Sequence, residues 1–189
     1  MTQRELQKEQ TRNKIYTTAI RLFAENGFHK TKISDIVKDA GVSVGSFYNY
    51  FPTKESIIDE GYRFFDEDLE KFWQSEKPEP GLQTIRYLLN VQVGYVVEVG
   101  VDWTSVFFKN QLGIEHHYYF ANSRFLYTKL KENTLFICPD EAQAENHVQA
   151  FLRIIRGTIY DWCLHDGQYD VAKTAMEAVE IYLEHHHLK

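Results

Sequence analysis

TKISDIVKDAGVSVGSFYNYFPTK, residues 31–54, is the stretch that determines the fold of this chain. It predicts two short helices, residues 33–40 and 44–50, joined by a tight turn. In the first helix, apolar side chains recur at the three- and four-residue spacing of one helical face. Gly41 ends this helix, because glycine adopts the left-handed conformation without a Cβ penalty. We expect Ser43 to cap the next helix, since its hydroxyl can accept a hydrogen bond from a first-turn amide.

The second of these helices has one apolar face and one polar face. Phe47 and Phe51 lie four residues apart and are expected to point inward, whereas the hydroxyl and amide side chains point outward. Gly45 lets the backbone approach another surface closely. Two helices joined by a glycine-containing turn are typical of a helix-turn-helix, whose second helix enters the major groove of DNA. A small surface hairpin, in which the serine and asparagine side chains act only as caps, is the alternative interpretation.

The run AGVSVGSFYNYFPTKESI, residues 40–57, resembles the helix-turn-helix signature of TetR-family transcriptional regulators, A-G-V-S-x-G-x-x-Y-x-Y/H-F-x-x-K. The preceding Gly27-Phe28, Thr31 and Ile36 also fit this family. The resemblance covers about the first quarter to third of the chain. It implies an all-α fold of about nine helices, with an N-terminal three-helix helix-turn-helix DNA-binding domain at residues 1–53 and a helical ligand-binding and dimerisation domain at residues 54–189.

The resemblance also implies which residues contact DNA. Lys54 corresponds to a phosphate ligand of the family, and Thr31, which we expect to cap the second helix, is a second candidate phosphate ligand. Val44 stands where relatives often carry lysine, so an apolar contact with a thymine methyl group is the substitute we expect there. The predicted DNA-binding residues are Thr31, Lys32, Ser43, Val44, Gly45, Ser46, Tyr48, Asn49, Tyr50 and Lys54.

The function implied by the resemblance is ligand-responsive regulation of transcription. A homodimer would bind double-stranded operator DNA, most simply as a repressor, and release it when a small organic effector binds the C-terminal domain. The alternative is a helical carrier or scaffold protein that binds a small molecule and whose DNA-binding head is degenerate.

The charge distribution agrees with a DNA-binding head. The whole chain carries a net charge of −6. Residues 1–55 contain nine Lys and Arg against six Asp and Glu, a net of +3, and the remainder contains twelve against twenty-one, a net of −9. A basic head on an acidic body would approach a polyanion head first. A solvated surface explains so modest an excess equally well.

The sequence lacks the usual signals of several other classes of protein. No run of about 18 apolar residues and no signal peptide is present, which indicates a cytoplasmic protein with no membrane partner. Cys138 and Cys163 lie outside any CxxC or Cys/His cluster. Neighbouring His116 and His117 point about 100° apart on a helix. The sequence lacks the two Glu-x-x-His pairs of a di-iron bundle, so we predict no enzyme activity, no metal and no cofactor.

The C-terminal part shows further helical patterns separated by short breaks. The clearest break is KPEPG at residues 77–81, and Asp140 with Gln143 has the form of a capping box. The expected helices are residues 5–26, 54–75, 82–99, 103–112, 119–135, 140–165 and 170–186.

Aromatic residues are frequent in the middle of the chain. Core filling explains any one of them, but their number, together with interspersed polar residues, suggests a cavity for an organic ligand. The predicted ligand-binding residues are Phe65, Phe72, Tyr95, Trp103, Phe107, Gln111, His117 and Phe125.

The last two expected helices carry broad apolar stripes. In TetR-like proteins these helices pair with their twofold mates as a four-helix bundle, so the resemblance implies a homodimer through them. The predicted interface residues are Phe151, Leu152, Ile155, Ile159, Trp162, Ala175, Ala178, Val179 and Tyr182.

Overall fold

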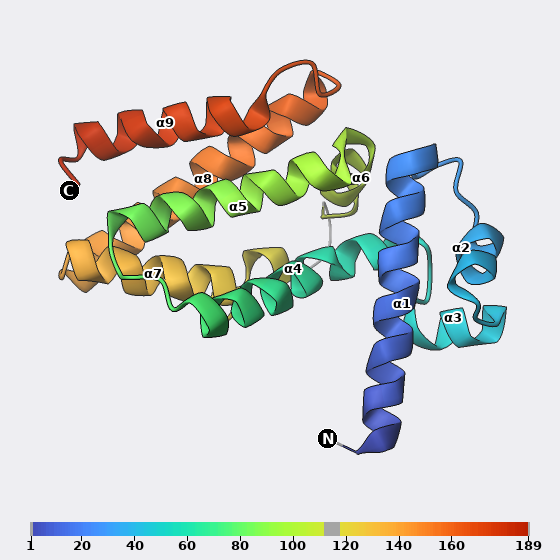
Figure 1. Cartoon of the computed structure of the whole chain (residues 1–189). Helices are drawn as coiled ribbons and strands as arrows, with labels where there is room; N and C mark the ends of the chain where they lie inside the picture. The colour runs from blue at the N-terminus through green and yellow to red at the C-terminus, as the bar shows by residue number, and fades with distance from the viewer. Residues whose placement is uncertain (1, 112–117, 189) are drawn as a thin grey trace. The chain divides into compact units, whose positions relative to one another are not determined.

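The computed structural model describes residues 2–111 and 118–188, and these residues form nine α-helices and one 3-10 helix with no strand (Figure 1). The predicted all-α class is therefore confirmed. The elements are α1 (Gln3–Asn26), α2 (Ile33–Ala40), α3 (Val44–Tyr50), α4 (Glu55–Glu76), α5 (Leu82–Val99), α6 (Val101–Gln111), η1 (Tyr118–Phe120), α7 (Phe125–Ile137), α8 (Glu141–Leu164) and α9 (Val171–His185).

The chain divides into two compact units. The first unit comprises Met1–Gly61 and Asp102–Leu112, and the second comprises Tyr62–Val101 and Gly113–Lys189. Helix α4 thus contributes its first turns to the first unit and the rest to the second, and most of α6 belongs to the first unit. The functional division predicted at residues 53 and 54 stays a prediction.

Local hydrogen bonds fix the helix ends in the first unit. The Ser46 amide donates to Ser43 Oγ over 3.0 Å, which is the predicted cap of α3. Gly41 ends α2 in the left-handed conformation, with φ +61°. The prediction that Thr31 caps α2 is wrong: Lys32 occupies the N-cap position, and its backbone amide donates to Asp35 Oδ2 over 3.0 Å.

The core of the first unit joins α1, α2 and α3. Apolar side chains from the three helices are fully buried, with Ile15, Ala19, Ile36, Ala40, Phe47 and Phe51 each 0% exposed. Phe28, in the α1–α2 connection, packs edge-on against Phe23 with ring centroids 5.0 Å apart. Because α3 has only seven residues, it depends on this packing for stability.

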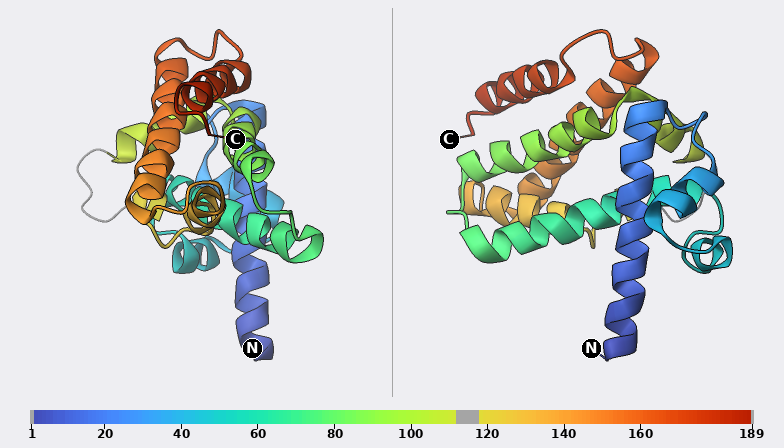
Figure 2. Two further views of the ribbon diagram at one scale, coloured as in Figure 1. Left: turned by 90° about the vertical axis from the view of Figure 1, so that its left-hand side faces the viewer. Right: turned by 45° about the vertical axis from the view of Figure 1, so that its right-hand side comes forward.

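The second unit is built from α5, α7, α8, α9 and residues 62–76 of α4. Helix α5 packs against α7, α8 and α9, and α8 packs against α7. In Figures 1 and 2, α8 (orange) and α9 (red) lie side by side. The core is aliphatic where these helices meet, with Leu88, Leu89, Val148, Ile155 and Val179 all fully buried.

One predicted helix of the second unit has the wrong start. The sequence predicted a helix over residues 119–135, whereas η1 covers Tyr118–Phe120 and α7 begins only at Phe125. Arg124 precedes α7 in an extended conformation, with φ −61° and ψ 143°. Its guanidinium is held in a buried ion pair, and this tertiary contact keeps the residue out of the helix.

Candidate nucleic-acid interface and ligand site

Helix α3 exposes the face that the sequence predicted to meet DNA. Val44 and Tyr48 are each 51% exposed, whereas Phe47 is fully buried and anchors the opposite face. Gly45 and Asn49 are exposed as well, and Ser46 and Tyr50 are partly exposed. The outer side of α3 therefore offers a serine hydroxyl, an amide, two phenols and a valine side chain, the kinds of group that read base edges and phosphates.

Lys54 and Thr31 both make contacts inside the first unit. The Lys54 ammonium donates to the carbonyl oxygens of Phe28 and Thr31, over 2.7 and 2.9 Å, and lies 4.1 Å from the centroid of the Phe28 ring. Partial burial lowers the pKa of Lys54. The buried Thr31 hydroxyl donates to the carbonyls of Leu22 and Gly27. These two side chains hold the α1–α2 connection against the start of α4.

Exposed lysines supply the positive charge of the first unit that is not neutralised by ion pairs. Arg12 pairs with Glu60, and Arg21 pairs with Glu25 and Asp39. By contrast, several exposed lysines have no ion pair within the described residues, namely Lys8, Lys14, Lys30, Lys32, Lys38 and Lys109. Such lysines remain available to a polyanion.

The predicted ligand-binding residues fall into separate groups. Phe65 and Tyr95 belong to one aromatic group of the second unit, with ring centroids 5.2 Å apart. Phe72 stacks on Tyr87 and is 37% exposed, and Phe125 lies edge-on to Trp73. Three more, Trp103, Phe107 and Gln111, are on α6 in the first unit. The rings of Trp103 and Phe107 stack with centroids 5.8 Å apart. His117 lies outside the described residues.

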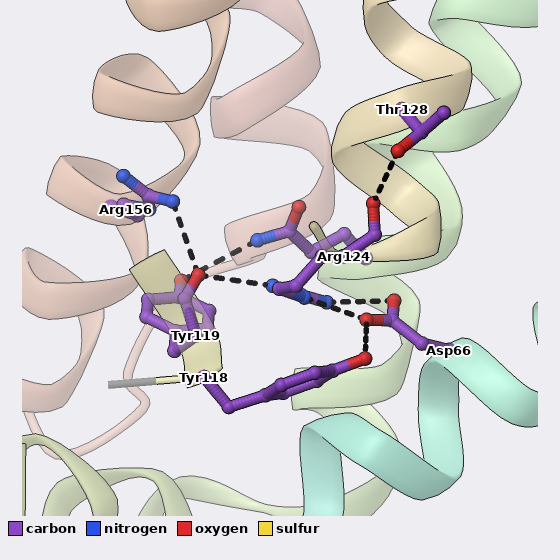
Figure 3. Close-up of polar contacts among 7 residues, drawn as sticks. Asp66, Tyr118, Tyr119, Arg124, Thr128 and Arg156 are labelled. Carbon is purple, nitrogen blue, oxygen red and sulfur yellow. Dashed lines mark hydrogen bonds and ion pairs between the residues drawn. The ribbon is translucent and has the colours of Figure 1, made fainter. Parts of the chain in front are cut away.

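A buried ion pair forms the centre of a polar cluster in the second unit (Figure 3). Arg124, 2% exposed, donates from Nε and Nη2 to the two carboxylate oxygens of Asp66 over 2.8 and 3.0 Å. The Tyr118 hydroxyl donates to the same carboxylate over 2.7 Å. Burial and this hydrogen bond raise the pKa of Tyr118. Burial opposes the charge of Arg124, but the bonds to Asp66 outweigh it and raise the pKa of Arg124.

Tyr119 links this pair to helices α5 and α8. Its carbonyl oxygen accepts hydrogen bonds from Arg124 Nη1 and Arg156 Nη2, both over 3.3 Å (Figure 3). Its hydroxyl lies 3.4 Å from the amide nitrogen of Gln92, which is fully buried. Burial lowers the pKa of Arg156. The polar cluster thus consists of Asp66, Gln92, Tyr118, Tyr119, Arg124 and Arg156.

The helix-turn-helix region is similar in sequence to known regulatory proteins. Residues 15–60 match the family model described as bacterial regulatory proteins, tetR family. The uncharacterized HTH-type transcriptional regulator YdgC of Bacillus subtilis is 39% identical over 75 residues, 40% of this chain and 38% of YdgC. The HTH-type transcriptional repressor KstR2 of Rhodococcus jostii is 42% identical over 62 residues, 33% of this chain and 30% of KstR2. The chain thus matches less than two-fifths of the length of either curated relative.

The solved structures extend the likeness in fold to about nine-tenths of the chain. The crystal structure of Thermus thermophilus FadR, a TetR-family transcriptional repressor in complex with lauroyl-CoA, superposes with a TM-score of 0.58 at 22% identity over 92% of this chain and 93% of that one. Bacillus subtilis FadR in complex with stearoyl-CoA gives a TM-score of 0.52 at 21% identity over 89% and 95%. Residues 15–60 thus carry a tetR-family helix-turn-helix, and the solved structures show that the chain shares their fold.

Most residues predicted for the dimer interface lie in the chain's own core. Phe151, Leu152, Ile155, Ile159, Trp162, Ala175 and Val179 are buried within the single chain, whereas Ala178 and Tyr182 are partly exposed. The exposed apolar side chains of the last two helices are Tyr160, Leu164 and Ile181, at 50%, 64% and 68% exposed. A shallow depression on α9 has Met176 and Ile181 in its lining.

Two absences hold for residues 2–111 and 118–188. No group of three or more His, Cys, Asp or Glu side chains is arranged to hold a metal ion within these ranges. Each described helix is too short or too polar to cross a bilayer. Four residues of the polar cluster are not among the predicted ligand-binding residues, namely Asp66, Gln92, Arg124 and Arg156. The signal for Asp66, Gln92 and Arg156 was a charged or amide residue inside an otherwise apolar helical stripe, whereas Arg124 precedes α7 and has no such signal.

Proposed function

We propose that this chain is a ligand-responsive transcriptional regulator of the cytoplasm, which binds operator DNA through α3 and releases it when a small organic molecule binds the second unit. The observation that carries the proposal is the exposed outer face of α3 on a TetR-type helix-turn-helix, with Val44 and Tyr48 half exposed. A helix that buries one phenylalanine face and exposes a polar face is suited to the major groove.

The operator-binding test compares two matched substitutions. An operator is selected from genomic fragments, and binding is measured by fluorescence anisotropy. Asn49→Ala removes an exposed amide of α3 and should weaken specific binding by about 1–3 kcal/mol, roughly 5- to 150-fold, if the amide reads a base. Asn90→Ala, an exposed position of α5, should leave binding unchanged. If no fragment is bound, the carrier interpretation is favoured instead. If a fragment is bound and both variants bind it equally well, Asn49 does not read a base.

The dimer is part of the same proposal. Two recognition helices must lie about 34–36 Å apart, or at a larger multiple, to meet successive turns of an operator. We assign the interface to the outer faces of α8 and α9, because Tyr160, Leu164 and Ile181 expose apolar surface there. Ile181→Glu should lower the sedimentation coefficient from dimer to monomer. Phe136→Glu, which alters a 63% exposed apolar residue of α7, should not.

The effector class is proposed from the neighbours. Two FadR proteins of the same fold were crystallised with lauroyl-CoA and stearoyl-CoA. Since a shared fold alone does not transfer a ligand, an acyl-CoA is the first class to test rather than a conclusion. Lauroyl-CoA should lower operator affinity in the anisotropy assay. Unchanged affinity at saturating lauroyl-CoA would remove acyl-CoA from the proposal and leave the DNA-binding part intact.

A further inference from the structure

The polar cluster of the second unit contains two guanidinium groups and one described carboxylate. Asp66 is fully used by Arg124, which takes both of its oxygens, and by Tyr118. Arg156 has no carboxylate partner within residues 2–111 and 118–188. Its Nη2 reaches only the carbonyl of Tyr119, and its Nε is buried without a hydrogen-bond partner.

The surroundings of Arg156 compensate its charge only in part. The guanidinium lies over the rings of Tyr119 and Phe120, 5.0 and 4.6 Å from their centroids. Such contacts are weak compared with an ion pair. The nearby charge of Arg124 is of the same sign. An arginine that is mostly buried therefore lacks the anion that normally accompanies a buried charge.

Gln92 provides a second unsatisfied group beside the same tyrosine. Its side chain is fully buried, its Nε2 lies 3.4 Å from the hydroxyl of Tyr119, and its Oε1 has no hydrogen-bond partner. Buried polar atoms without partners are rare, because each loses its hydrogen bonds to water and gains nothing in return. Arg156 Nε and Gln92 Oε1 are two such atoms, on side chains that both contact Tyr119. They indicate a place where a polar molecule supplies the missing hydrogen bonds.

The apolar side of the site is a series of aromatic rings that begins at Tyr119. Tyr62 is 4.4 Å from Tyr119, and Tyr95 is 5.5 Å from Tyr62, between ring centroids. Phe65 follows, 5.2 Å from Tyr95. A molecule with a charged end at Arg156 would therefore have buried aromatic rings next to it.

We propose that the effector is an amphipathic organic acid, whose carboxylate or phosphate pairs with Arg156, whose second polar group bonds to Gln92, and whose apolar part packs on these aromatic rings. This inference rests on the proposed function, since it names the chemical class of the effector. An acid group can accept two parallel hydrogen bonds from Nε and a terminal nitrogen of one guanidinium, and this geometry makes such pairs strong.

The test measures ligand binding without DNA, by isothermal titration calorimetry below the micelle concentration. The probes share one apolar chain and differ at the end: dodecanoate, dodecyl phosphate and dodecan-1-ol. On the unmodified chain, at least one acid should bind roughly tenfold or more tightly than the alcohol, the advantage of a charge-assisted hydrogen bond over a neutral one. Comparison of the two acids distinguishes a carboxylate site from a phosphate site. Equal binding of acids and alcohol overturns the inference.

Variants then locate the preference. Arg156→Gln should abolish the acid preference, and Arg156→Lys, which keeps the charge but not the planar donor pair, should restore part of it. Arg153→Gln makes the same change at an exposed position of the same helix and should preserve the preference. If Arg156→Gln keeps the full preference, the inference is wrong. If that variant does not fold, the acid-against-alcohol comparison on the unmodified chain still decides.

The two proposals can fail separately. Acid preference with no operator binding would refute the regulator and keep the ligand class. Operator binding and release by a ligand that binds equally well to Arg156→Gln would keep the regulator and refute the role of Arg156.

Discussion

Lys54 is expected to hold the first unit together, and the substitution Lys54→Met tests this. Methionine keeps most of the aliphatic stem and removes the ammonium group. Three contacts are lost: the hydrogen bonds to the carbonyls of Phe28 and Thr31, and the cation–π contact in which the ammonium nitrogen lies 4.1 Å from the centroid of the Phe28 ring. Those carbonyls lie in the connection between α1 and α2, so the change loosens the segment that positions α2.

The size of the effect follows from these contacts. A hydrogen bond to a charged group contributes about 1.5–3 kcal/mol, and an exposed cation–π contact about 0.5–1 kcal/mol. Water can reach the partly exposed site and replace part of the loss, so we expect about 2–3 kcal/mol rather than the full sum. For a chain of this length, that lowers the unfolding midpoint by roughly 4–12 °C.

The assay pairs thermal unfolding with the salt dependence of operator binding. Lys32→Met removes an exposed lysine at the N-cap position of α2 and should leave the unfolding midpoint within about 2 °C. If Lys32 contacts a phosphate, this variant should also reduce the slope of log K against log salt by about 1. Lys54→Met should lower the midpoint and weaken binding through the loosened head.

One pattern would refute this reasoning about Lys54. If Lys54→Met unfolds at the temperature of the unmodified chain and loses about one unit of salt slope, its ammonium is a phosphate ligand in the complex and its internal bonds contribute little. The family role inferred from the sequence would then be the correct one.

Three further predictions concern single residues. Asp66→Asn leaves a buried arginine uncompensated and should destabilise the second unit by about 3–5 kcal/mol in denaturant titrations, whereas Asp68→Asn, at the surface of the same helix, should cost under about 1 kcal/mol. Gly41→Ala forces a left-handed conformation at φ +61° and should cost about 1–2 kcal/mol by the same measurement. Burial and the nearby His186 lower the pKa of His147 from its usual value. Because the unfolded chain takes up this proton at a higher pH than the folded chain does, the free energy of unfolding should fall as pH drops below about 6.5. His147→Gln should make the free energy of unfolding less dependent on pH in this range.

The first unit was predictable because its signals are local. The bounds of α2 and α3 agree with the sequence prediction to the residue. Gly41 and Ser43 mark the turn by their own backbone and side-chain chemistry, within three residues of the bonds they make. The cap of α2 was misassigned to Thr31 because a hydroxyl next to a helix start is a common cap. Its hydroxyl instead donates to carbonyls four and nine residues earlier in the chain.

The second unit was less predictable because its decisive contacts join distant residues. Arg124 pairs with Asp66, 58 residues earlier, and no helical periodicity encodes that pairing. Apolar stripes on α8 and α9 identify buried faces but not what covers them, so side chains such as Phe151 and Ile155, assigned to a dimer, are buried in the chain's own core. The aromatic count likewise could not separate Trp103 on α6 from Tyr95 on α5, which belong to different compact units.

An effector that releases DNA must shift the chain from a DNA-competent state to a second state. The chain passes from one unit to the other after residues 61, 101 and 112, and the first crossing lies inside the continuous helix α4. Moving a regulator from about 99% to about 1% DNA-competent requires a binding preference of roughly 5.5 kcal/mol between its two states. A charge-assisted pair with Arg156 contributes about 1.5–3 kcal/mol at most. The remaining 2.5–4 kcal/mol equals the burial of about three to five methylene groups at ~0.8 kcal/mol each. If the effector pairs with Arg156 as proposed, its acid group alone therefore falls short of the required preference, and the effector needs an apolar chain as well to displace the operator.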